Sequence, residues 1–268
     1  MTLYEGRNYL TGPTEAEIKE YNRICDEEQI EGMPYGKRNL YRKYPEAIRH
    51  YNSLFPNNHI DLFDWQNSGN MEKLIDEFAA IVHDENSQER DILRFINHRP
   101  AHFIIGSLLT YKDFGHHKAY IFPEFSIGNG IYYADYLIIG KNSGGYEFLF
   151  VELEAPNGRT TRKNGHEGLA TRKGLEQIDD WKYMIDKDFD AISKELKKHS
   201  NKVDLFPNEL LNYDSTRMHY TVICGTRDDY NDVTYRDRRA KKKEMHIDLY
   251  HYDNLIDISR NLIDRVTF

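Results

Sequence analysis

Hydrophobic residues, many of them aromatic or β-branched, are concentrated along three stretches in the middle of the chain, over residues 119–127, 131–139 and 146–154. Short runs of this kind, bounded by turn sequences, are typical of β-strands. Gly128-Asn129-Gly130 follows the first stretch, and a second turn sequence at residues 142–145 follows the next. The pattern therefore predicts three strands that can pair in antiparallel fashion through hairpins.

Helical spacing of hydrophobic residues occurs on both sides of these strands. Thr14 and Glu17 fit a capping box that would open an early helix. The other helices are predicted over residues 44–55, 71–83, 87–99, 101–109, 168–187 and 255–266, and the segment 235–245 is predicted as a basic helix or loop. Two further strands are predicted over residues 219–226 and 247–252.

This order of elements predicts an α/β fold in which helices flank a mixed central sheet. Residues 1–85 are expected to form a mostly helical N-terminal region, and residues 86–268 the domain that carries the sheet. The chain has 268 residues, which is enough for one sizeable core or for a main domain with a smaller one.

Composition and charge narrow the class of protein. Hydrophobic residues make up 39% and charged residues 30%, as in a soluble globular protein. No signal-peptide pattern and no apolar run of membrane-spanning length is visible, and Cys25 and Cys224 are too few for a disulfide framework, so we expect a cytoplasmic protein. The net charge of −8 argues against general coating of nucleic acid, but it leaves room for a local basic surface.

Two acidic residues end the third predicted strand. Glu152 and Glu154 are two positions apart and so point to the same face, and Asp135 lies in the strand before them. Buried carboxylates need a partner, and a hard cation such as Mg²⁺ accepts one or two carboxylates with water and phosphate. Asp135, Glu152 and the backbone carbonyl of Leu153 would form such a partial shell. Pairing of these acids with Lys or Arg from the next helix is an equally good interpretation of the spacing.

A basic, glycine-containing loop follows the acids. It brings Arg159, Arg162, Lys163 and Arg172 close to them in sequence, and such groups could hold DNA phosphates. A solvated loop without function is the alternative. A second basic run, Arg236 to Lys243, could contact the DNA backbone, a partner subunit or nothing. No zinc-binding spacing and no nucleotide-binding P-loop is present.

The strand–strand–helix context of these acids resembles the core of the PD-(D/E)XK nucleases. The segments FPEFSIGNGIYYADYLII, FVELEAP, LEQIDDW and VICGTRDDY resemble, more narrowly, the Shedu family of anti-phage defence nucleases. The resemblance spans about residues 87–260 and leaves out the N-terminal helical part. It implies a restriction-endonuclease-like core.

The resemblance also implies roles for individual residues. Asp135 and Glu152 would be the metal ligands, with Glu124 or Glu89 completing the acidic cluster. Glu154 stands where the wider superfamily usually has lysine, so the missing positive charge would come from Lys173, or Glu154 would help to bind a second cation. Gln177, one helical turn after Lys173, would orient the attacking water or the scissile phosphate.

The expected activity is therefore that of a Mg²⁺-dependent deoxyribonuclease, with Mn²⁺ as a substitute, which cuts or nicks phage DNA with little sequence specificity. The resemblance implies a homo-oligomer, with a tetramer expected. One alternative is a nuclease-like module that binds DNA or a partner without cutting, which the glutamate at position 154 favours. Another is a glycosidase that uses the paired carboxylates without a metal.

Overall fold

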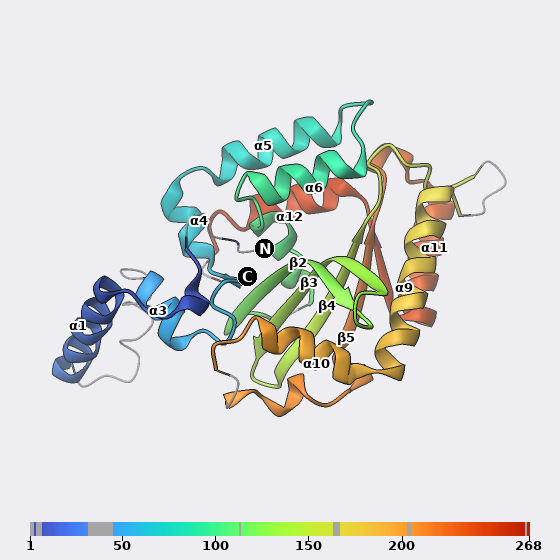
Figure 1. Ribbon diagram of the computed structural model, residues 1–268. Helices are drawn as coiled ribbons and strands as arrows, with labels where there is room; N and C mark the ends of the chain where they lie inside the picture. Colours follow the sequence, from blue (N-terminus) through green and yellow to red (C-terminus); the bar gives the residue numbers. More distant parts are fainter. Residues whose placement is uncertain are drawn as a thin grey trace.

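The computed structural model of the protein describes residues 3, 7–31, 45–112, 114–162, 167–202, 205–265 and 267–268. In these segments the chain forms a six-stranded mixed sheet with helices on both faces (Figure 1). The α/β class with a mixed sheet and flanking helices, predicted from the sequence, is confirmed. The helices described contain no stretch long and apolar enough to cross a membrane.

The sheet has the strand order β1-β2-β3-β4-β5-β6. Its strands are β1 (His59–Ile60), β2 (Lys118–Ile127), β3 (Tyr132–Asn142), β4 (Gly145–Leu153), β5 (Met218–Ile223) and β6 (Ile247–Tyr250). β1 to β4 pair in antiparallel fashion, whereas β5 and β6 are parallel to β4. The change of direction requires a crossover after β4, and that crossover carries the longest helix in the described chain.

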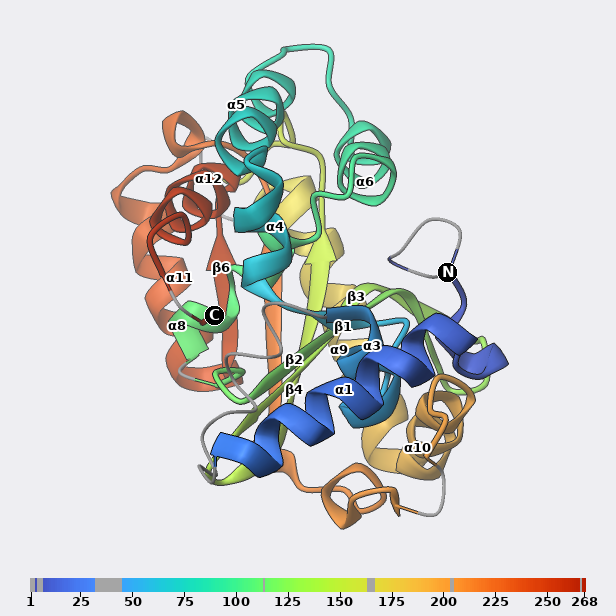
Figure 2. The same ribbon diagram turned by 90° about the vertical axis from the view of Figure 1, so that its left-hand side faces the viewer.

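Helices cover both faces of the sheet and flank its β6 edge (Figure 1). They are α1 (Glu15–Glu31), α3 (Pro45–Asn52), α4 (Leu62–Ser68), α5 (Met71–Val82), α6 (Glu89–His98), α7 (Phe103–Gly106), α8 (Leu109–Lys112), α9 (Leu169–Lys187), α10 (Phe189–Lys198), α11 (Asp232–Met245) and α12 (Tyr252–Asn261). α5, α6 and α12 cover one face of the sheet, and α9 and α10 cover the other (Figure 1). α11 lies along the edge strand β6 (Figure 2).

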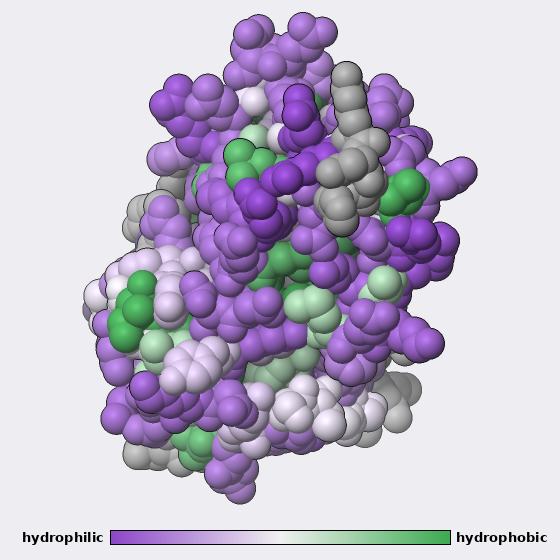
Figure 3. Space-filling model, turned by 90° about the vertical axis from the view of Figure 1, so that its right-hand side faces the viewer, coloured by the Kyte–Doolittle hydropathy of each residue, from purple (hydrophilic) through white to green (hydrophobic). Residues whose placement is uncertain are grey.

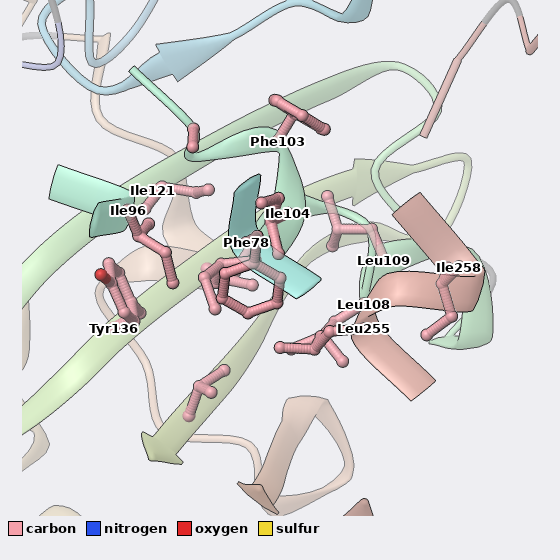
Figure 4. Packing of buried hydrophobic residues seen from close by; sticks show 14 of the residues in the cluster. Phe78, Ile96, Phe103, Ile104, Leu108, Leu109, Ile121, Tyr136, Leu255 and Ile258 are labelled. Atoms are coloured by element: carbon pink, nitrogen blue, oxygen red, sulfur yellow. The ribbon is translucent and has the colours of Figure 1, made fainter. Parts of the chain in front are cut away.

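Each face of the sheet has its own hydrophobic cluster. In the first, Phe78 of α5 and Leu255 of α12 pack over the strands together with Ile104 (Figure 4). In the second, Trp181 of α9 and Phe150 of β4 are fully buried. A strand covered on both faces is hydrophobic at nearly every position, so a polar residue in β4 stands out.

The predicted helices and strands occur close to their expected places. The Thr14–Glu17 capping box is present, with both reciprocal hydrogen bonds. The turn at residues 128–130 joins β2 to β3 and all three of its residues have positive φ, which explains its two glycines. The structure differs in some elements: the helix expected at 101–109 is divided into α7 and α8, and β1, α4 and α10 were not predicted.

Part of the predicted N-terminal region belongs to the same packed body as the sheet. β1 pairs with β2, and α5 packs against α12. α1 instead packs on α3, away from the sheet (Figure 1). The predicted division between residues 85 and 86 remains a prediction about domains.

The β2–β3 hairpin is kinked near the middle of both strands. Paired positions continue at the same register on either side of Glu124 and Asp135, but these two residues, which face each other, are not themselves ladder partners. Glu124 has a φ of 48°, and the alternation of faces is interrupted there: Phe122 and Phe125 both belong to the cluster under α9. The kink interrupts the pairing of β2 with β3 beside the candidate site, although both strands continue beyond it.

Candidate active site

Two buried glutamates end β4 on the side of the sheet that α9 covers. Leu149, Val151 and Leu153 point into the cluster under α5 and α12, so the alternate positions point toward α9. Glu152 and Glu154 occupy these alternate positions, and each is only 3% exposed. A carboxylate in such a place needs a counter-charge, hydrogen bonds or a proton.

Asp135 lies next to Glu152 across the strand pair. The β3–β4 register pairs Tyr136 with Val151, so the following position of β4, Glu152, lies opposite Asp135. The backbone N–H of Leu153 donates a hydrogen bond of 2.7 Å to Oδ2 of Asp135. This bond fixes the orientation of the Asp135 carboxylate relative to the end of β4.

α9 brings a positive charge to these acids. Lys173 Nζ lies 3.1 Å from Oε1 and 3.1 Å from Oε2 of Glu154, and 3.3 Å from Oε2 of Glu89 on α6. Glu154 is therefore paired with a lysine from the next helix, one of the two interpretations that the spacing allowed. Because Lys173 is about half exposed, its ammonium group can also be reached from solvent.

Glu152 differs from Glu154 in having no such partner. Within the described segments its carboxylate accepts no hydrogen bond and forms no ion pair. Two adjacent glutamates on one face of one strand are therefore in different electrostatic states. Glu154 has Lys173 as a counter-charge, whereas Glu152 has no ion-pair partner among the described residues and can take up a proton or an external cation.

The pKa values of all three acids are raised. Burial raises the pKa of Glu154 to about 7, against the opposing effect of Lys173. Burial also raises the pKa of Asp135 and that of Glu152, and the mutual repulsion of these two carboxylates adds to the shift of Glu152. Acids that hold their protons this strongly release them when a cation arrives.

Close packing of α9 against the sheet depends on Gly174. A Cβ at this position would lie 2.5 Å from Cγ1 of Val222 on β5 and 3.5 Å from Cγ of Glu154. Glycine weakens a helix by about 1 kcal/mol relative to alanine. At this position the loss in helix stability accompanies a close approach of α9 to β5. Because α9 lies this close to the sheet, the side chain of the preceding residue, Lys173, can contact Glu154.

Gln177 lies one turn after Lys173 on α9. Its side chain is half-buried, and Oε1 is enclosed without a hydrogen-bond partner within the described chain. An amide oxygen in this state costs about 1–3 kcal/mol unless a ligand or water satisfies it. A buried amide oxygen without a partner is typical of a side chain that hydrogen bonds to a substrate or to a bound water.

Tyr252 was not singled out from the sequence, yet it holds the same segment. Its hydroxyl donates a 2.7 Å hydrogen bond to the carbonyl oxygen of Glu154. The side chain is fully buried and comes from α12, 98 positions further along the chain. No local sequence pattern points to a contact over such a separation.

Glu124 has a different environment from the other acids. It is exposed, and it lies opposite Asp135 at the kink of the hairpin. No contact joins it to Glu152 among the described residues. Its role as a further metal ligand stays a prediction.

No ready-made metal cage exists in the described part of the chain, since no three His, Cys, Asp or Glu side chains converge to hold an ion. Asp135 and Glu152 offer two carboxylates. This donor set suits a cation such as Mg²⁺ that keeps several waters, and it does not suit a structural site built only from protein ligands.

The loop after β4 is anchored at its base. Thr160 Oγ1 donates to the carbonyl of Asp229, and Thr161 is hydrogen bonded to Thr234 of α11 at 2.6 Å. Arg159 and Arg162 are exposed beside these anchors. Arg172 is exposed on α9 and lies 3.8 Å from Glu176. Lys163, also predicted to bind DNA, lies outside the described residues.

A search of the curated proteins found no match to this chain. A family model described as Shedu protein SduA, C-terminal, matches residues 86–256. The matched region includes the acids of β3 and β4, Lys173 and Gln177, and it covers more than half of the sequence. The chain belongs to the Shedu family.

Proposed function

We propose that the protein is a metal-dependent DNA endonuclease of bacterial defence against phages. The family membership suggests the defence role. The observation that carries the nuclease proposal is the pair of unequal glutamates: Glu152 is buried and unpartnered beside Asp135, while Glu154 binds Lys173. Such a site combines a place for a cation with a fixed ammonium group, and hydrolysis of a phosphodiester uses both.

Asp135 and Glu152 would hold Mg²⁺ or Mn²⁺, with the Leu153 carbonyl as a third oxygen ligand. The ion would supply Lewis acidity and a bound water of lowered pKa. The residues of the chain have separate tasks around it. Lys173 directs its ammonium group at the negative charge that grows on the phosphate, and Glu154 fixes the position of that group.

Gln177 orients the attacking water or a phosphate oxygen through its side-chain amide. Its unpartnered buried oxygen supports this role, because it can accept a hydrogen bond from water. Arg159, Arg162, Lys163 and Arg172 would bind phosphates on either side of the cut. Little sequence specificity is proposed, since contacts to phosphates carry no sequence information.

Cleavage of supercoiled and linear duplex DNA in Mg²⁺, Mn²⁺ or EDTA tests the proposal. We expect cutting that needs the metal and falls at least about 100-fold in Glu152→Gln. Calorimetric titration of Mn²⁺ should show tight binding only when Glu152 is intact. Asp180→Asn, which removes an exposed carboxylate on α9, is the matched control and should cut and bind metal like wild type. Equal cutting by Glu152→Gln, or no cutting in any metal, would refute the proposal.

One observation favours the alternative of a nuclease-like binding module. Lys173 is held by Glu89 as well as by Glu154, so its charge is largely neutralised inside the protein. In that case DNA would bind equally well with wild type and Glu152→Gln, and neither would cut it. The proposed homotetramer is tested independently by light scattering of the purified protein.

A further inference from the structure

The basic run of residues 236–243 is divided between two faces of α11. Arg238, Lys241 and Lys242 point back onto the protein: the Arg238 guanidinium lies 4.7 Å from the Tyr250 ring, Lys241 pairs with Glu167 at 2.7 Å, and Lys242 pairs with Asp248 at 3.0 Å. These three positions are three and four residues apart and so share one side of the helix.

The remaining cations of the run lie on the opposite side. Arg236, Arg239 and Lys243 are all exposed and form no ion pair within the described chain. They too are three and four positions apart, so they form a single row, which we call the α11 stripe. Its two ends are seven positions apart along the helix, which is about 10 Å. Asp232 lies one turn before Arg236 on the same side of the helix, so the row of positive charges does not extend beyond Arg236 in that direction.

The three cations of the α11 stripe do not serve to neutralise acidic side chains among the described residues. The chain as a whole carries a net charge of −8, and exposed cations in an acidic protein would ordinarily find acids nearby. Among the described residues the division of the run is complete, since each inward cation has a partner and each outward one has none. An external polyanion is the simplest partner for a row of this kind.

The α11 stripe is connected to the candidate active site through the loop after β4. Thr161 is hydrogen bonded to Thr234, and Glu167 pairs with Lys241, so both sides of that loop contact α11. The loop begins directly after the acids of β4 and carries Arg159 and Arg162. Figure 3 shows that hydrophilic side chains cover most of the face on which α9 and α11 lie.

We infer that the α11 stripe binds the phosphate backbone of duplex DNA and guides it to the site at the end of β4. The inference rests on the proposed function and names the path of its substrate. Duplex DNA carries one negative charge per about 1.7 Å of axis, so a 10 Å row of three cations faces more than enough phosphates. Because the contacts are to phosphates, the stripe contributes affinity without sequence preference.

Salt dependence of DNA binding tests this inference. Binding of a fluorescent duplex in EDTA is measured against salt for wild type and for Arg236→Gln/Arg239→Gln/Lys243→Gln. Loss of three phosphate contacts should lower the slope of log K against log salt by about 2.7 and weaken binding at least about ten-fold at low salt. The control, Lys194→Gln/Lys197→Gln/Lys198→Gln on α10, removes the same charge from another face and should keep the wild-type slope.

The outcome separates this inference from the nuclease proposal. If the wild type binds but does not cut with any metal, the nuclease proposal fails and the stripe is still judged by its salt slope. The inference is overturned if the stripe variant binds DNA with the wild-type slope or loses no more affinity than the α10 control. That result would leave the nuclease proposal untouched, because cleavage by the wild type is measured separately. Absence of any duplex binding by the wild type also overturns it, and an acidic protein partner would then be the remaining assignment.

Discussion

Lys173 Nζ on α9 lies 3.1 Å from each carboxylate oxygen of Glu154, the residue directly after β4, and donates a hydrogen bond to Oε2. A helix thus brings an ammonium group to the end of β4, where its partner is a buried carboxylate. In the proposed nuclease, Lys173 would supply from α9 the positive charge that the resemblance led us to expect at position 154. The pair also explains how a glutamate can be buried at position 154.

A double-mutant cycle separates the structural from the catalytic role of this pair. Lys173→Met should destabilise the protein because it leaves Glu154 buried without a counter-charge, and Glu154→Gln in the same chain should restore most of that loss. Since Lys173 is half exposed, we expect a coupling free energy of only about 1 kcal/mol. Urea unfolding of the four proteins measures it.

DNA cleavage by the same four proteins should follow a different pattern. The double variant is expected to be as stable as wild type but to stay at least about ten-fold slower, because the ammonium group is missing. Recovery of cleavage together with stability would show that Lys173 acts only as a structural counter-ion.

Gly174 offers a test of the helix–strand approach. Gly174→Ala should be destabilising by about 1–3 kcal/mol, because its Cβ would lie 2.5 Å from Cγ1 of the buried Val222. Val222→Ala removes the clashing methyl groups, so it should cost less in the Gly174→Ala background than alone. Thermal unfolding of the single and double variants measures the sign of this coupling. Additive losses would contradict the proposed contact.

Gln177→Ala should lower the rate of cleavage without lowering stability. The buried Oε1 has no partner within the described chain, so removing it loses no hydrogen bond, and the free energy of unfolding should change by less than about 0.5 kcal/mol. If Gln177 orients water or phosphate, kcat should fall about ten-fold or more with little change in KM.

The control for this change is Asp180→Ala, an exposed position three residues further along the same helix. It should keep the wild-type rate and stability. Equal rates for Gln177→Ala and Asp180→Ala would remove Gln177 from the site.

The fold was predictable because its helices have a clear hydrophobic period and its central strands are hydrophobic runs between turn sequences. The three central strands and α9 appear within a few residues of their expected ends. β1 and α10 were missed for opposite reasons: two residues are too few to show a period, and α10 follows α9 after a single residue, Asp188, which caps it. The kink at Glu124 could not be predicted, because glutamate rarely adopts the positive φ that it has here.

The members of the candidate site were visible in the sequence, but their pairing was not. The spacing of Glu152 and Glu154 placed both on one face, and the position of Lys173 before Gln177 placed both on one helical side. Which glutamate takes the lysine depends on the packing of α9 on β4 and β5, which periodicity does not encode. Glu89 reaches Lys173 from 84 positions away, and its place was set by the packing of α6.

The stability of the metal-free protein should depend on the ionisation of Glu154. Its pKa is raised from 4.5 in the unfolded chain to about 7, so between these pH values the unfolded state releases a proton that the folded state keeps. The contribution of Glu154 to stability therefore decreases as pH rises from 4.5 to 7, by about 3 kcal/mol, and is constant outside this window.

Comparison with Glu154→Gln isolates this effect from other titrating groups. Buried histidines such as His59 and His102, whose pKa values burial lowers, gain stability over part of the same range, but they do so equally in both proteins. In EDTA, the stability of Glu154→Gln relative to wild type should therefore rise steadily from pH 4.5 to pH 7. A difference that does not vary with pH would mean that Lys173 keeps Glu154 ionised throughout, and that its burial is already compensated by the ion pair.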